Sequence, residues 1–182
     1  MSNESNTASR VEAALKGLIE DGAFSTDPGG MLSVRVPADN IHAACKALRD
    51  EAGFETNTFV TARDHGADED ERFEVLYQFL SYAHKDRVRV SVMTTGDDPE
   101  VQSIRDLWPG IWFSERECFD MFGVRFKGHG DLRRLLMPEG FDHHPLRKDF
   151  PHIGIQPDKL YRQWDAARRA EYAAEQANEG GH

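Results

Sequence analysis

Cysteine is scarce in this chain, which contains only Cys45 and Cys118 among its 182 residues. Two cysteines so far apart cannot supply a four-cysteine zinc or iron–sulfur site, and they cannot build a disulfide framework. Cys45 lies on the apolar side of an expected helix, where it would belong to the core. We therefore expect a protein of a reducing compartment that holds no metal and no cofactor of its own.

The sequence also lacks long hydrophobic runs and any excess of positive charge. No stretch approaches the roughly 18 consecutive apolar residues of a membrane-spanning helix, and the N-terminal residues have no apolar signal-peptide core. The formal net charge of −10 argues against binding to nucleic acid or to an anionic membrane surface. We expect a protein made in the cytosol that reaches a membrane only by docking on a membrane-bound partner.

Alternating apolar residues predict four strands, at residues 31–36, 54–62, 73–82 and 87–93. A helix with apolar residues at helical spacing is expected between the first two strands, over residues 39–52. An acidic loop separates the second and third strands and is expected to be a solvated hairpin tip. This order predicts an α+β fold, a two-layer sandwich with a mostly antiparallel four-stranded sheet.

Besides a short helix that begins at Ser114, three further helices are expected outside these strands. One begins at Ser9 and ends at Gly22. Another begins at Asp98, with Pro99 at its first helical position, and ends at the following Pro-Gly pair. The last residues, rich in Ala, Glu and Arg, predict a terminal helix.

A capping-box pattern begins the stretch from Ser114 to Pro151, which has equal numbers of acidic and basic residues. Ser114 and Glu117 have the spacing at which a serine caps a helix start and a glutamate bonds back to the cap. Gly123 is placed to end this short helix. We expect structural roles for all three residues.

The remaining charged residues of this short helix are Glu115, Arg116 and Asp120. We expect Glu115 and Arg116 to face solvent, and Asp120 to pair with Arg116 four residues earlier. Acid–base catalysis by these carboxylates is the alternative interpretation. A structural role for Asp120 explains the pattern without any chemistry, so we predict no catalytic residue here.

Four histidines in the second half of the chain invite a metal-site interpretation: His129, His143, His144 and His152. Their spacing matches none of the compact ligand patterns of zinc proteins, and two of them flank turns or prolines. We therefore predict no metal site.

Half of the eight prolines are spaced six or seven residues apart near the C-terminal end, at Pro138, Pro145, Pro151 and Pro157. Each proline removes a backbone donor and keeps the preceding residue out of the helical region. The pattern predicts a stiff extended run of about 20 residues that reaches outward along another protein. Pre-stiffening would lower the entropic cost of that binding.

We predict that charged and aromatic residues of this run bind the partner, either directly or by bracing the strand: Arg133, Arg134, Arg147, Lys148, Asp149, Phe150 and Pro151. The alternative is a set of surface salt bridges of little energetic value. The expected organisation begins with an N-terminal helix and linker (residues 1–30) and an α+β domain (31–126). An extended partner-clasping segment (127–157) and a helical tail (158–182) follow.

Several short motifs in this half of the chain resemble one family. They are Trp108-Pro-Gly-Ile-Trp112, Glu115-Arg-Glu117, Asp120-Met-Phe-Gly123, Asp131-Leu-Arg-Arg134 and His144-Pro-Leu-Arg-Lys-Asp-Phe-Pro151. The pattern resembles the 30-kilodalton subunit family of NADH:quinone oxidoreductase, which is respiratory complex I. The resemblance is specific over about residues 104–151. Gly130 and His143 depart from the family pattern, which usually has proline and glycine there.

This resemblance implies a cofactor-free structural subunit of the peripheral arm, on the cytoplasmic side of the membrane. Its expected partners are the large quinone-site subunit, which it would clasp, and neighbouring peripheral-arm subunits. One alternative is the equivalent subunit of a membrane-bound hydrogenase or of another donor:quinone or ferredoxin oxidoreductase. A more remote alternative is a free-standing enzyme that uses Asp120 with His144.

Overall fold

The computed structural model describes residues 2–27, 29–152, 162–163 and 165–171. Its helices are α1 (Ser2–Ala14), α2 (Ile41–Asp50) and α3 (Trp112–Phe122), with the short 3-10 helices η1 (Ala38–Asn40) and η2 (Pro109–Ile111). Its strands are β1 (Phe24–Thr26), β2 (Leu32–Arg35), β3 (Thr56–Asp64), β4 (Phe73–Ser81), β5 (Asp86–Thr94), β6 (Glu100–Gln102) and β7 (Arg125–Lys127).

The main sheet has the strand order β1-β2-β5-β4-β3. Only the β2–β5 pair is parallel, and the other three pairs are antiparallel. The prediction of an α+β fold with a mostly antiparallel sheet is confirmed, although this sheet has five strands rather than four. The added strand, β1, is only three residues long and lies in the stretch interpreted as a linker.

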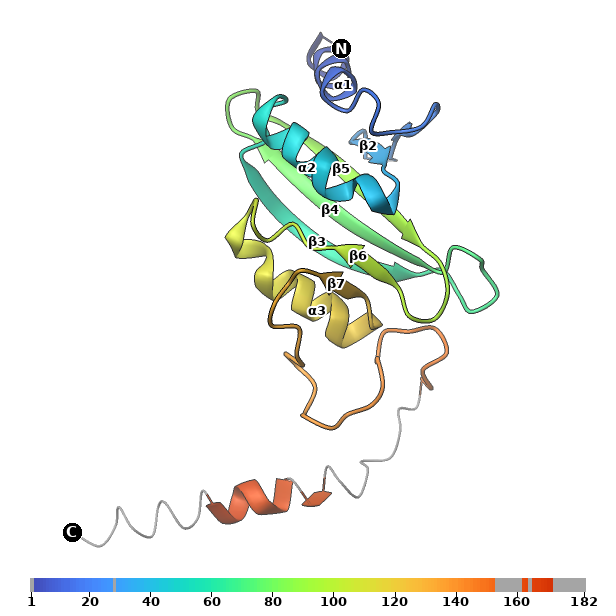
Figure 1. Cartoon of the computed structure of the whole chain (residues 1–182), viewed down its shortest axis with the longest axis vertical. Helices are drawn as coiled ribbons and strands as arrows, with labels where there is room; N and C mark the ends of the chain where they lie inside the picture. The colour runs from blue at the N-terminus through green and yellow to red at the C-terminus, as the bar shows by residue number, and fades with distance from the viewer. Residues whose placement is uncertain (1, 28, 153–161, 164, 172–182) are drawn as a thin grey trace, which may run out of the picture.

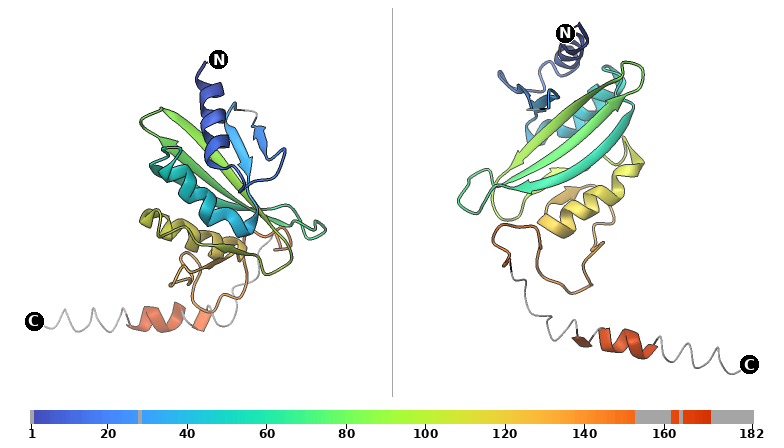
Figure 2. Two further views of the ribbon diagram at one scale, coloured as in Figure 1. Left: turned by 45° about the horizontal axis from the view of Figure 1, so that its top comes forward. Right: turned by 180° about the vertical axis from the view of Figure 1, so that it is seen from behind.

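One face of the sheet carries the core. The inward side chains of β4 and β5 alternate with outward ones, so Phe73, Tyr77 and Val90 are fully buried. Helices α2 and α3 pack on this face, and viewed from behind no described helix covers the other face (Figures 1 and 2). The arrangement is the expected two-layer sandwich.

The helix expected from Asp98 to the Pro-Gly pair is wrong. The chain there forms β6, which pairs in parallel with β7 to make a second, two-stranded sheet. Val101 and Phe126 lie opposite each other in this ladder, and both are buried. Burial of this pair and the ladder hydrogen bonds outweigh the local Asp-Pro cap signal, because intrinsic propensity is a weak preference.

The N-terminal helix also differs from its predicted bounds. It spans Ser2–Ala14 instead of running from Ser9 to Gly22, and residues 15–18 form turns. Gly17 has a positive φ of 81°, a conformation that ends helices readily in glycine. Val11 and Leu15 are nevertheless buried against the domain, as their spacing indicates.

The C-terminal part is described only in pieces. Residues 162–163 and 165–171 are helical, which agrees with a terminal helix, and the rest of the predicted tail lies outside the described residues. Within the described part of the chain, no helix has both the length and the apolarity needed to cross a bilayer.

The segment predicted to be extended is not extended where the structure describes it. Residues 128–152 form turns and bends that loop beneath α3 (Figure 1). The first residue assigned to that segment, Lys127, instead ends strand β7. We call residues 131–151 the anchored segment, because polar contacts tie it to the α+β domain.

Candidate functional site

Helix α3 positions most of the candidate residues, and it begins earlier than predicted. Its N-cap is Ile111, the last residue of η2, and no side chain caps the helix start. Ser114 therefore lies inside the first turn and Glu117 is exposed on the surface. The capping-box prediction for these two residues is wrong, because the preceding Pro-Gly turn already delivers Trp112 in helical conformation.

Glu115 and Arg116 are buried, which contradicts their expected exposure. Both carboxylate oxygens of Glu115 accept hydrogen bonds, from the Ser103 hydroxyl at 2.6 Å and from the Ile104 amide at 3.0 Å. Burial raises the pKa of Glu115 to about 7, although these two hydrogen bonds partly oppose the rise. Glu115 thus joins α3 to the chain that follows β6.

Arg116 does not pair with Asp120. Its guanidinium donates to the carbonyl oxygens of Arg133 and Arg134, at 3.2 and 2.8 Å. A buried guanidinium that reaches two successive carbonyls fixes the backbone of the anchored segment against the side of α3. The structural interpretation of Arg116 holds, but its partner lies 17 or 18 residues away rather than four.

Asp120 is the central contact of this site. Its side chain is completely buried, and its Oδ1 accepts from the Arg134 guanidinium at 2.9 Å. Its Oδ2 accepts from three consecutive amides, those of Leu135, Leu136 and Met137, at 3.0, 2.6 and 2.9 Å. Burial alone would raise the pKa of Asp120, but these donors together hold it below its usual value.

The last three carbonyl groups of α3 also accept hydrogen bonds from the anchored segment. They belong to Asp120, Met121 and Phe122, and their donors are, in order, His144 Nδ1 at 3.0 Å, the Leu146 amide at 3.0 Å and Arg147 Nε at 2.6 Å. These carbonyls would otherwise lack partners at the helix end, where positive charge is favoured.

Gly123 ends α3 as predicted, with a positive φ of 79° at the C-cap. The same glycine is closely approached by the anchored segment. A Cβ atom added there would lie 2.7 Å from the His144 ring and even closer to the Arg147 guanidinium. Gly123 is therefore required both by the helix end and by the packing of the segment over it.

A second attachment joins the segment to the β3–β4 hairpin. Buried Arg72 donates to both oxygens of Asp64, each at 3.1 Å, and it also pairs with Asp97 at 2.6 Å and Asp149 at 2.8 Å. The Lys148 amide donates to Asp64 at 2.7 Å. Burial raises the pKa of Asp64, but the Arg72 and backbone donors outweigh it and hold the pKa low.

The anchored segment separates its charged residues into two groups. Arg134 and Arg147 turn inward, towards Asp120 and the end of α3. Arg133, Lys148, Asp149 and Pro151 are exposed and Phe150 is half-buried. The structure therefore brings only part of the predicted partner-binding set to the surface.

Two leucines of this surface were missed by the sequence interpretation. The side chains of Leu136 and Leu146 are 59% and 53% exposed on the anchored segment. The Leu136 amide donates a hydrogen bond to the Asp120 carboxylate, and the Leu146 amide donates one to the Met121 carbonyl. The one signal in the sequence was proximity to arginines of the family motifs, because Leu146 precedes Arg147 within one motif and Leu136 follows Arg134, the end of another, by two residues.

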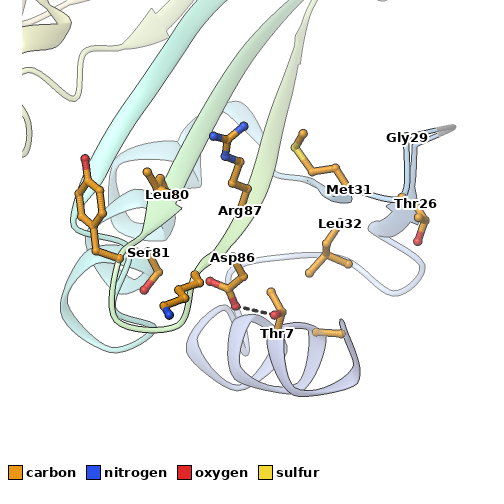
Figure 3. A pocket seen from close by; sticks show the side chains of 13 residues that line it. Thr7, Thr26, Gly29, Met31, Leu32, Leu80, Ser81, Asp86 and Arg87 are labelled. Atoms are coloured by element: carbon orange, nitrogen blue, oxygen red, sulfur yellow. Dashed lines mark hydrogen bonds between the residues drawn. The ribbon is translucent and has the colours of Figure 1, made fainter. Parts of the chain in front are cut away.

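Neither the histidines nor a groove at the far end of the molecule brings the candidate residues into a catalytic arrangement in the described part of the chain. Among the described residues, no group of three or more His, Cys, Asp or Glu side chains is placed to hold a metal ion. A groove of about 870 Å³ lies at the far end of the molecule, between α1 and the β4–β5 hairpin. Figure 3 shows Thr7 bonded to Asp86 beside this groove, and neither was a candidate residue.

The sequence matches the family described as "Respiratory-chain NADH dehydrogenase, 30 Kd subunit" over residues 34–156, which is more than half of the chain. The chain belongs to this family. Two relatives are named as the C subunit of NADH-quinone oxidoreductase. The one from Bordetella petrii is 41% identical, over 71% of this chain and 70% of the relative. The one from Moorella thermoacetica is 45% identical, over 63% of this chain and 76% of the relative. The chain is thus a member of a family of complex I-type subunits.

Two solved structures share the fold of this family member. A trypsin-resistant fragment of Nqo5 matches with a TM-score of 0.59 at 27% identity, over 71% of this chain and 99% of the fragment. A chain of the membrane-bound sulfane sulfur reductase, an archaeal respiratory membrane complex, matches with a TM-score of 0.62 at 22% identity, over 81% and 87%. The second likeness concerns the fold alone.

Replacement of Asp120 by alanine should strongly destabilise the isolated chain. The change leaves the partly buried Arg134 guanidinium and three amides without their acceptor, at an expected cost of about 3–5 kcal/mol in the free energy of unfolding. Urea unfolding of the purified chain measures this cost. Asp131→Ala is the control, because the exposed Asp131–Arg133 pair should contribute under about 1 kcal/mol. Equal losses in the two variants would contradict the anchoring role of Asp120.

Replacement of Glu115 by glutamine should change how stability depends on pH. The pKa of Glu115 is about 7 in the folded state and about 4.3 in the unfolded state. Between these two pH values the folded state binds more protons than the unfolded state, so the stability of the wild type falls as pH rises from about 4.3 to about 7. In Glu115→Gln the amide oxygen can still accept from the Ile104 amide and the NH2 group can donate to the Ser103 hydroxyl, so the variant removes the charge and keeps both contacts. It should match wild type near pH 5 and exceed it by roughly 2–4 kcal/mol near pH 8. Urea unfolding at both pH values measures this, with exposed Glu117→Gln as the control. A variant that is less stable than wild type near pH 8 would refute it.

Proposed function

We propose that this chain is a non-catalytic structural subunit that clasps the large, quinone-site subunit of an NADH:quinone oxidoreductase through the anchored segment. The observation that carries the proposal is the division of that segment into two sides. One side is tied to Asp120 and Arg72, while the other presents Leu136, Leu146 and Lys148 to solvent. Other subunits of the complex are the partners this surface would meet.

The physical advantage of this arrangement is preorganisation. An irregular loop loses conformational entropy when a partner orders it, and a loop already fixed in place avoids much of that cost. Each exposed leucine, once buried by a partner, would contribute about 1.5–3 kcal/mol. Arg133 can add a bidentate contact beside them, because its side chain is 68% exposed and has only an exposed pair with Asp131.

The residues that could support chemistry already have structural roles. The Asp120 carboxylate is buried and accepts four hydrogen bonds from the segment. His144 contacts the backbone carbonyl of Asp120 rather than its carboxylate. This geometry disfavours a free-standing enzyme built on Asp120 and His144, since the carboxylate would have to give up those bonds to act as a base. The subunit would sit on the cytoplasmic side of the membrane, held there by the complex.

Subunits of this family type occur in more than one kind of complex, and the comparisons favour one of them. Relatives named as the C subunit of NADH-quinone oxidoreductase match at 36–45% identity, whereas the sulfane sulfur reductase chain matches at 22%. This difference favours the NADH-linked complex over a complex of the sulfane sulfur reductase type.

A pair of variants separates bracing from direct contact. Arg147→Ala removes donors to the Phe122 and Asp97 carbonyls, so it should lower the stability of the isolated chain by about 1–3 kcal/mol and also lower assembly. Leu146→Asp changes only an exposed side chain, so it should leave stability within about 0.5 kcal/mol of wild type while lowering assembly.

The measurement is the amount of large subunit that co-purifies with each variant from solubilised membranes, together with NADH:quinone turnover per assembled complex. Both variants should reduce assembly, and the complexes that do form should turn over at a near-normal rate. Normal assembly with a large loss of turnover per complex would place Arg147 beside the reaction path and refute the structural role.

A further inference from the structure

An aromatic cluster on the anchored segment lies outside the hydrophobic core of the domain. It consists of Phe141, His143 and Phe150, whose ring centroids lie 5.8, 6.2 and 6.5 Å apart. None of the three belongs to the hydrophobic core or to the half-buried residues packed against it, unlike Leu132 and Met137 of the same segment. The rings pack on one another at the surface.

The three rings are steeply inclined to one another rather than stacked. Their planes meet at 74° between Phe141 and His143, 53° between Phe141 and Phe150, and 59° between His143 and Phe150. No ring is therefore sandwiched face to face between the other two. Aromatic faces carry negative partial charge, and a face left open attracts a cation within about 6 Å of its centroid.

Contacts of the neighbouring backbone and of Asp149 fix the segment on which these rings lie. The Phe141 carbonyl accepts a hydrogen bond from Arg134, which is itself fixed by Asp120. Asp149, next to Phe150 in sequence, pairs with buried Arg72. Each end of the aromatic cluster is thus attached to one of the two points that anchor the segment.

The charges around the cluster favour a positively charged occupant. Asp142 lies between two of its rings in sequence, is exposed, and makes no ion pair within the described part of the chain. Glu139 is also exposed. The opposing charges are exposed Lys148 and half-buried Arg147, which has no ion pair in the described part of the chain, whereas Arg72 meets three carboxylates, those of Asp64, Asp97 and Asp149. The nearby Arg134 guanidinium is neutralised by Asp120. The balance is acidic, as it is for the whole chain, whose formal net charge is −10.

We propose that Phe141, His143 and Phe150, together with Asp142, form a docking site for a cationic side chain, arginine or lysine, of a neighbouring subunit. The inference rests on the proposed function of the anchored segment as a subunit interface, and it names the chemistry of one contact within that interface. Ring faces and a carboxylate together bind a guanidinium or ammonium group better than either alone, because partial desolvation by the partner strengthens both attractions.

The first test titrates the purified full chain with blocked arginine amide, followed by NMR of the aromatic ring protons. Blocked citrulline amide, which has the same shape without the charge, is the matched control. Ring protons of the cluster should shift with arginine and not with citrulline. Phe150→Leu and Asp142→Asn should each weaken the arginine response by about 2–5-fold, the range expected for one exposed cation–π contact. No arginine-specific shift, or equal shifts with citrulline, would overturn the proposal.

The second test uses the assembled complex and a Phe141→Leu, Phe150→Leu double variant, which keeps apolar bulk but removes two ring faces. Phe113→Leu makes the same change at an exposed position on α3 and is the control. The double variant should be released from solubilised complex at lower salt than wild type or Phe113→Leu. Release at the wild-type salt concentration would overturn the proposal, since apolar contact alone would then explain the cluster.

The two proposals fail in different ways. If Leu146→Asp lowers assembly but the aromatic double variant assembles and resists salt like wild type, the segment is the interface and the cation site is wrong. If neither Leu146→Asp nor the double variant affects assembly, the proposed function itself is wrong, and the cation site falls with it.

Discussion

The structure depends on one buried carboxylate. Asp120 lies at the last turn of α3 and accepts hydrogen bonds from one guanidinium and three consecutive amides of the anchored segment. An unpaired charge in that position would be very costly, so the helix end and the segment stabilise each other. Removal of either partner would leave the other with buried polar groups and no acceptor or donor. The segment is therefore best described as part of the domain rather than as a separate arm.

This constraint gives a physical basis for the interface role proposed for the anchored segment. A surface that must be recognised by a large partner needs a fixed backbone, and irregular loops rarely have one. Here the fixation comes from the end of α3, from Arg72 in the β3–β4 hairpin and from close packing over Gly123. The side chains left over, above all Leu136 and Leu146, are free to meet a partner. Membership of the 30 Kd subunit family agrees with such a role.

Short-range patterns in the sequence predicted the regular part of this fold well. The alternation of Val88, Val90 and Val92 predicted β5 to within a residue or two, because one face of that strand is buried and the other is not. The end of α3 at Gly123 was predicted for a similar reason, because helix termination by glycine depends on the local backbone alone. Strand β6 was mistaken for a helix because its stability comes from pairing with β7, which is separated from it by about two dozen residues of chain and leaves no local mark.

The candidate site was harder to predict, for a related reason. Asp120 and Arg116 were recognised as structural, but each was assigned to the other because they are four residues apart on one helix. Their real partners come from a loop whose path cannot be read from proline spacing. Proline favours extended backbone at single residues, yet the turns between prolines let the chain fold back onto α3. Burial of Glu115 was missed because its two donors, Ser103 and Ile104, lie outside its own helix.

The central claim is that the anchored segment is held on its own domain before any partner binds. Hydrogen exchange of the Leu135, Leu136 and Met137 amides in the isolated full-length chain tests it most directly. The account predicts that these three amides exchange slowly, with protection comparable to that of β4 and β5 and lost together when Asp120 is replaced. Rapid exchange of all three in a chain whose sheet amides remain protected would contradict it, because the segment would then be ordered only by its partner.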